Sequence, residues 1–266
     1  MASTGAIAMR APVSRAVRER RETRNVFYVR VVVALVIVAI WEFLSRSGLF
    51  FGDVVPSLTK IIPALFTLLA NPVFWANLQI TLIEAAASLA IGAVAGIVVG
   101  ILLGSSRFFG AAFEPYVYYL SPTPRIILFP IMIMWFGVGI ASKIALGALS
   151  SFFAIALSTA AGMRQIDKVL IRVGRSFRAT PWQMATKIYL PAMRLPVLTG
   201  IRLGLGNALI TALLAETKLS NQGLGFMIMQ IYTRFDMPTL YALLIIVFFI
   251  AGACNAVIGM LSRSTK

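Results

Sequence analysis

Three arginines recur at every third position within IRVGRSFRATPWQMATKIYLP, the stretch that covers residues 171–191. They are Arg172, Arg175 and Arg178, and Lys187 adds a fourth cation, while the stretch contains no Asp or Glu. Guanidinium groups recognise carboxylates and phosphates through charge-assisted hydrogen bonds. The sequence therefore predicts a binding surface, which either rests on anionic lipid or docks onto a protein partner.

Two short helices are expected to position these cations. Apolar residues recur at helical spacing on one face and cations on another, namely Ile166, Leu170, Val173 and Phe177 against Arg164, Lys168, Arg172 and Arg175. The letters TPWQ predict a second helix start, with Thr180 as N-cap, Pro181 in the first helical position and Gln183 completing a capping box. Pro191 is expected to end that helix. A stretch of cations that only sets the orientation of the chain in the membrane does not need two capped helices. The capped pair therefore favours a docking element.

A second set of candidate residues lies inside apolar stretches, where ionisable groups mark functional sites by default. Arg125 follows the break SPTPR and could meet an anionic solute, or it could pair with Glu84 or Glu114 inside the bundle. The nearby run MIMWF, with Met132, Met134, Trp135 and Phe136, is either an adaptable gate or ordinary packing. We take Glu84, Arg125 and this run as candidates for a translocation pathway, and expect Arg202 and Glu216 to reach the membrane interfaces.

Catalytic patterns are absent from the sequence. The glycine-containing stretch GSSRFFG lacks the G-K-[ST] ending of a phosphate-binding loop. No paired carboxylates, no nucleophile with an adjacent base and no metal-ligand cluster appear, and the chain has no His and a single Cys, Cys254. We expect neither an enzyme nor a bound cofactor or metal.

The composition indicates an all-α membrane protein. The chain has 266 residues, of which 59% are hydrophobic and 12% charged, and its mean hydropathy is +0.90. Apolar stretches predict about six transmembrane helices, at about Val31–Leu44, Leu78–Leu103, Ala112–Phe136, Ile144–Ala161, Leu195–Leu214 and Leu240–Leu261. The second carries Gly92, Gly96, Gly100 and Gly104 on one face, where another helix can approach closely.

The distribution of Lys and Arg predicts the topology. The net charge of +15 could suggest nucleic acid, but the cations cluster beside apolar spans, which excludes that partner and indicates lipid headgroups. Seventeen of the 24 Lys and Arg fall on the side that holds both termini and residues 164–194, so this side is expected to be cytoplasmic. We divide the chain into a basic cytoplasmic arm, 1–30, and a transmembrane domain, 31–266, with a cytoplasmic segment at about 164–191.

Several stretches resemble one family. The run IYLPAMRLPVLTGIRLGLGNALITALLAE with a later GLG, together with LFPIMIMWFGVG and STAAGMRQID, is similar to permease subunits of bacterial ABC importers of the nitrate, alkanesulfonate and taurine type. The resemblance spans about residues 56–261. Those permeases carry a loop motif of Glu-Ala-Ala, three residues, Gly, nine residues and Ile-x-Leu-Pro. Placing Ile188, Leu190 and Pro191 on its end puts Arg172, Val173 and Gly174 on the Glu-Ala-Ala and Arg178 on the Gly.

The resemblance implies a type I permease fold in the bacterial inner membrane and a set of partners. It implies two cytoplasmic ATPase subunits that hold ATP and Mg, a second permease subunit in a homodimer or heterodimer, and an external solute-binding protein. The loop would be the coupling helix that receives the ATPase stroke, and the solute would be small, with an anion among the options. Because Arg172 replaces an acid, the ATPase should present a more acidic groove, or the chain is one half of a heterodimeric pair.

Two other classes of membrane protein remain open on the sequence alone. An ion-coupled secondary transporter would need several acids at mid-membrane, whereas only Glu84 lies well inside a span, and no internal repeat is visible. A structural or assembly protein would need neither a Pro-broken helix nor a capped pair on the cytoplasmic side.

Overall fold

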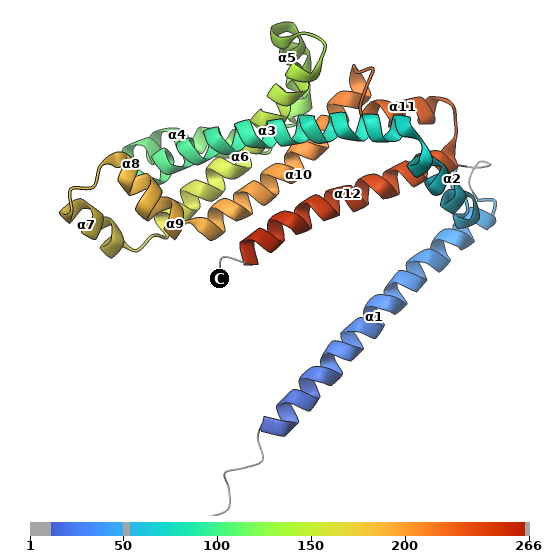
Figure 1. The fold of residues 1–266 in the computed structure, drawn as a ribbon, viewed down its shortest axis with the longest axis horizontal. Helices are drawn as coiled ribbons and strands as arrows, with labels where there is room; N and C mark the ends of the chain where they lie inside the picture. Colours follow the sequence, from blue (N-terminus) through green and yellow to red (C-terminus); the bar gives the residue numbers. More distant parts are fainter. Residues whose placement is uncertain (1–11, 50–53, 264–266) are drawn as a thin grey trace, which may run out of the picture. The chain divides into compact units, whose positions relative to one another are not determined.

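The structure, a computed structural model, describes residues 12–49 and 54–263, and every regular element in these ranges is a helix (Figure 1). The chain divides into two compact units, residues 1–62 and 63–266, which are described separately. The first unit holds α1, Pro12–Arg46, and the start of α2, Leu58–Ala70. Near the end of α1, Glu42 accepts a hydrogen bond from the Leu58 amide at 3.1 Å.

The second unit contains the long helices of the bundle. They are α3, Pro72–Ser105; α4, Arg107–Leu120; α6, Ile140–Arg164; α10, Arg194–Lys218; and α12, Met237–Arg263. Shorter helices are η1, Arg125–Leu128; α5, Phe129–Phe136; and α11, Leu224–Thr233. Between α6 and α10 lie α7, Lys168–Ser176; α8, Pro181–Gln183; the π-helix η2, Met184–Tyr189; and α9, Leu190–Ala192.

The predicted count of about six spans is confirmed. Five of the described helices are long and apolar enough to cross a membrane, and the sixth span is a bent pair in which Arg107–Leu120 meets Arg125–Phe136 at 91°. The bend falls at SPTPR, where Pro122 and Pro124 remove backbone donors. The spans are longer than predicted: α3 already begins at Pro72, with the side chain of Asn71 accepting from the Val73 amide at its N-terminus.

A glycine seam, Gly92, Gly96, Gly100 and Gly104, joins α3 to α6. A Cβ at these positions would come within 2.7–3.0 Å of the backbone oxygens of Ala148, Phe152, Ala156 and Ala160, one turn apart on α6. Only glycine allows two helix backbones to lie this close. On α10, Gly200 lies close to Ser158 and to the backbone of Ile155 on α6, and Gly204 leaves room for the Ile155 side chain. The three helices α3, α6 and α10 therefore form the closely packed core (Figure 1).

Candidate functional site

The segment between α6 and α10 is a capped helix pair, as predicted. It lies at the end of the bundle opposite α11 (Figure 1). Thr180 Oγ1 accepts from the Gln183 amide at 3.2 Å, and Gln183 Oε1 accepts from the Thr180 amide at 2.9 Å, which completes the capping box with Pro181 in the first turn. The first helix is likewise capped, since Asp167 Oδ1 accepts from the Val169 amide at 2.8 Å.

The end of the second helix differs from the prediction. Pro191 does not end it, because the helical backbone runs through the π-turns of η2 and then through α9 to Ala192. Pro191 lies in α9, directly after the π-turns of η2. Leu190 begins α9, and the chain enters α10 at Arg194. A single turn residue, Met193, thus joins the second helix of the pair to α10.

Gly174 is the contact point between α7 and the rest of the segment. It is buried, and a Cβ there would lie 2.6 Å from Met184 Sδ and would also collide with Ile188 on η2. Most of the predicted apolar stripe does not pack in this way: Leu170 and Val173 are half exposed, and Phe177 is 82% exposed. Trp182 on α8 is 76% exposed. An apolar ridge therefore accompanies the cations on the outside of the segment.

Arg178 lies in a left-handed backbone conformation, with φ of 50°. It follows the C-cap of α7, and the amides of Arg178 and Ala179 donate to the carbonyls of Arg175, at 2.9 Å, and Gly174, at 3.0 Å. These two bonds define a Schellman motif, in which glycine is the favoured residue at the position that Arg178 occupies. The geometry explains the glycine in the family motif: a non-glycine residue is tolerated here at a conformational cost.

Arg172, Arg175 and Arg178 are all exposed to solvent. Within the described residues none of them has a carboxylate partner, and Lys187 is also exposed. Three guanidinium groups beside an apolar ridge can bind a surface that supplies carboxylates around apolar pockets. No bond-making chemistry is available from this set of side chains.

The candidate pathway residues are not brought together. Met132 is buried in a core cluster with Phe129, Leu146 and Ala215. In contrast, Met134 is 84% exposed, Trp135 72% and Phe136 51%, on the helix α5 that projects from the bundle in Figure 1. The run MIMWF therefore divides into two packing residues, Met132 and Ile133, and three outward-facing ones.

Arg125 begins η1 and is partly buried. Its guanidinium lies 5.0 Å from the centre of the Phe153 ring and donates to the carbonyl oxygen of Ser121, while its Nε has no hydrogen-bond partner. The alternative in which Arg125 pairs with Glu84 or Glu114 is wrong, because Glu84 pairs with Lys143 and Glu114 with Arg164. A partly desolvated cation without a carboxylate partner is suited to an anion.

Glu84 belongs to a buried polar cluster that the sequence did not reveal. Lys143, which directly precedes the predicted span Ile144–Ala161, lies within α6, and its Nζ is 2.8 Å from both Glu84 Oε1 and Ser220 Oγ. Glu216, expected to reach the interface, is only 1% exposed and lies close to Glu84. The cluster consists of Thr81, Glu84, Lys143, Glu216 and Ser220, and it ties α3, α6 and α10 together.

The same cluster holds the start of α11. Glu216 Oε2 accepts from the Gly225 amide at 2.6 Å, and Thr81 Oγ1 accepts from the Leu224 amide at 2.9 Å while donating to Glu216 Oε1. A carboxylate at a helix N-terminus satisfies orphan donors and complements the helix dipole. Gly223, with φ of 101°, leaves the space that the Glu216 carboxylate fills. The sequence signal for this arrangement is the pair of glycines in NQGLGF, Gly223 and Gly225.

The described helices define a polytopic membrane protein. Residues 92–264 match the family profile described as "Binding-protein-dependent transport system inner membrane component". The chain belongs to this family, the permease subunits of ABC importers.

Named relatives and a solved structure agree with this assignment. The chain is 32% identical over 228 residues to a putative aliphatic sulfonates transport permease protein of Bacillus subtilis, covering 86% of this chain and 83% of the relative. It is 30% identical to a taurine transport system permease protein of Escherichia coli, over 73% and 72% of the two chains. A structure of the inward-facing MetNI methionine ABC transporter matches with a TM-score of 0.65 and 20% identity, covering 74% of this chain and 99% of that one. This last likeness shows a shared fold.

Proposed function

We propose that the helix pair at 164–191 is the coupling element of an ATP-driven importer, and that it docks into a groove on a cytoplasmic ATPase subunit. The observation that carries the proposal is the combination, on one exposed capped segment, of Arg172, Arg175 and Arg178 with the unpacked side chains Phe177 and Trp182. A segment that only rested on lipid would need no Schellman motif and no capping box.

The partner surface follows from these residues. Its groove carries carboxylates opposite the three arginines, because guanidinium groups pair with carboxylates. It also carries an apolar pocket for Phe177, because burial of this exposed ring stabilises the complex. ATP and Mg are held by the ATPase subunits, of which two serve each transporter. Two permease subunits form the pathway, and an external solute-binding protein delivers the solute. The termini and residues 164–194 face the cytoplasm.

Charge reversal tests the coupling role. In proteoliposomes that contain the complete transporter, the double variant Arg172→Glu and Arg175→Glu is expected to keep its place in the membrane. It should, however, lose at least tenfold in solute transported per ATP hydrolysed. Lys218→Glu, which reverses an exposed cation at the other end of α10, is the matched control and should transport normally. Unchanged coupling in the double variant would refute the docking role.

Labelling tests the orientation independently. The chain contains one cysteine, so Cys254→Ser gives a background in which Arg175→Cys is the single target. A membrane-impermeant maleimide should label residue 175 in inverted vesicles and leave it unlabelled in intact cells or spheroplasts. Labelling from the outside would overturn both the orientation and the coupling proposal.

For the solute, we propose a small molecule that carries a sulfonate group. The support is the naming of two relatives for aliphatic sulfonates and taurine, together with the partly buried Arg125, whose guanidinium lacks a carboxylate partner among the described residues. Arg125→Ala should reduce uptake of butanesulfonate and taurine at least tenfold, with protein levels unchanged. Full uptake by this variant would remove Arg125 from the pathway, whereas failure of wild-type protein to transport either solute would exclude the sulfonate class.

A further inference from the structure

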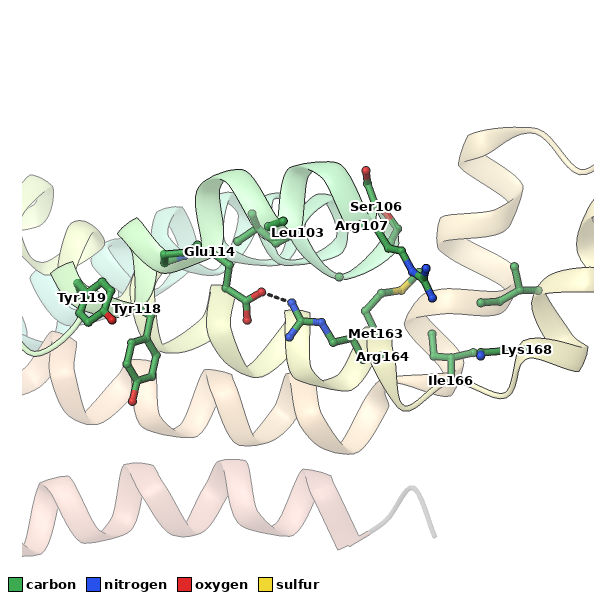
Figure 2. Close-up of a pocket in the computed structure, with 16 residues that line it drawn as sticks. Leu103, Ser106, Arg107, Glu114, Tyr118, Tyr119, Met163, Arg164, Ile166 and Lys168 are labelled. Carbon is green, nitrogen blue, oxygen red and sulfur yellow. Dashed lines mark hydrogen bonds and ion pairs between the residues drawn. The ribbon is translucent and has the colours of Figure 1, made fainter.

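A cavity of about 770 Å³ lies at the end of the bundle that carries the coupling pair. Its walls are the C-terminal ends of α3 and α6, one face of α4 along its length and the start of α7 (Figure 2). Leu103, Met163 and Ile166 are buried and supply an apolar floor. The cavity is large enough for a headgroup-sized ligand and is separate from the exposed ridge of the coupling pair.

Cations outnumber acids in the lining. Arg107, Arg164 and Lys168 face a single carboxylate, Glu114, so the formal charge of the lining is +2. Figure 2 shows Arg164 of α6 bound to Glu114 of α4 across the cavity. Within the described chain, Arg107 and Lys168 have no carboxylate partner and are exposed. The nearby Asp167 is engaged in capping α7 and is not part of the lining.

Backbone geometry adds to this positive character. The first residue of α4, Arg107, lies in the lining together with its N-cap Ser106, so the N-terminal end of a 14-residue helix opens onto the cavity. Ser106 Oγ accepts from the Phe109 amide at 3.3 Å, and the remaining amides and the dipole at such an end favour an anion. Gly110 brings α4 close to α3, because a Cβ there would lie 2.7 Å from the Leu103 carbonyl oxygen. The same cavity is therefore lined by two cations without a carboxylate partner, by a helix N-terminus and by an apolar floor.

We propose that this cavity binds a tetrahedral oxyanion, a phosphate or a sulfonate, that is attached to an apolar group. The oxyanion lies between Arg107 and Lys168 at the first turn of α4, and the apolar group lies on Leu103 and Met163. Basic pockets between transmembrane helices at the cytoplasmic face bind anionic lipid headgroups, and a short alkanesulfonate has the same two-part chemistry. Since Lys168 begins α7, a bound anion connects the coupling helix to α4.

Binding to the complete transporter in lipid nanodiscs tests the site with two probes. In the lipid arm, native mass spectrometry counts dioleoylphosphatidylglycerol molecules retained from a mixture with phosphatidylcholine. In the soluble arm, titration calorimetry measures butanesulfonate binding in nanodiscs of phosphatidylcholine alone, with the solute-binding protein left out. The double variant Arg107→Gln and Lys168→Gln should bind phosphatidylglycerol, butanesulfonate or both at least tenfold more weakly than wild type. The control Lys218→Gln should bind both probes as wild type does.

A gain of affinity separates the proposal from a folding defect. Glu114→Gln removes the one acid of the lining and should tighten binding about threefold to tenfold, because one fewer like charge then opposes the anion at short range. Loss confined to the lipid arm identifies a phospholipid headgroup, and loss confined to the soluble arm identifies a free anion. Equal binding by wild type and the double variant in both arms, or no gain in Glu114→Gln, would overturn the site. Because the experiment measures binding, it tests the proposed anion site independently of the coupling role of α7.

Discussion

The ion pair between Lys143 and Glu84 gives the sharpest test of the polar interior of the bundle. Lys143 Nζ lies 2.8 Å from Glu84 Oε1, and the two side chains are 4% and 0% exposed. Glu84 Oε2 has no hydrogen-bond partner, so Lys143→Met leaves both oxygens of this carboxylate unpaired and next to Glu216. Breaking a buried pair by removing one member costs about 3–5 kcal/mol.

The expected loss in Lys143→Met is therefore about 10²-fold to about 4,000-fold in the unfolding equilibrium, at about 1.4 kcal/mol per tenfold. The double variant Lys143→Met and Glu84→Met should recover most of this loss, to within about 1 kcal/mol of wild type, because apolar residues of similar volume can replace a buried pair. It also returns the formal charge of the cluster to that of wild type, with Glu216 as the remaining acid.

The assay is unfolding of the purified chain by SDS in mixed micelles, followed by far-ultraviolet circular dichroism. Wild type, the two single variants and the double variant form a thermodynamic cycle. The reasoning predicts that Lys143→Met is the least stable of the four. It is refuted if Lys143→Met stays within about 1 kcal/mol of wild type, or if the double variant is no more stable than Lys143→Met.

Three further predictions concern the backbone. Gly96→Val should destabilise the α3–α6 contact by about 1–3 kcal/mol through overpacking, whereas Gly206→Val, where a Cβ meets nothing within 4 Å, should change SDS resistance little. Arg178→Gly should slow hydrogen exchange of the Ala179 amide about twofold to fivefold by relieving the left-handed conformation, and Arg178→Ala should give no such gain. Thr180→Ala should lower the free energy that protects the Gln183 amide from exchange by about 1 kcal/mol, so this amide exchanges about fivefold faster, and Thr180→Ser should leave its exchange unchanged.

The parts of the fold that the sequence predicted are those with local signals. The broken third span could be inferred because Pro122 and Pro124 act on their own backbone, and the capping box because Thr180 and Gln183 are three residues apart. The glycine spacing of α3 likewise indicated a close helix contact, though not which helix would meet it. Each of these inferences depends on residues within about one or two helical turns.

The polar cluster escaped prediction because its bonds join distant residues. Lys143 and Glu84 are 59 positions apart, and Thr81 and Glu216 are 135 apart. Taken singly, a Lys or Glu near the end of an apolar stretch is most simply placed at the interface. Only the folded arrangement shows that the polar groups satisfy one another and can lie in the interior. The left-handed backbone of Arg178 was missed for another reason: this conformation is typical of glycine, and no neighbouring residue indicates it for an arginine.

The close approach of α3, α6 and α10 has a mechanical consequence for the membrane domain. Backbones that meet at glycine have no side-chain layer in which to slip, so these three helices move together as one body. The coupling pair is inserted between two of them, since α6 ends at Arg164 just before it and α10 begins at Arg194 just after it. If the pair receives the ATPase stroke, as proposed above, the push would reach both ends of the insertion at once, and the three helices would tilt as one body.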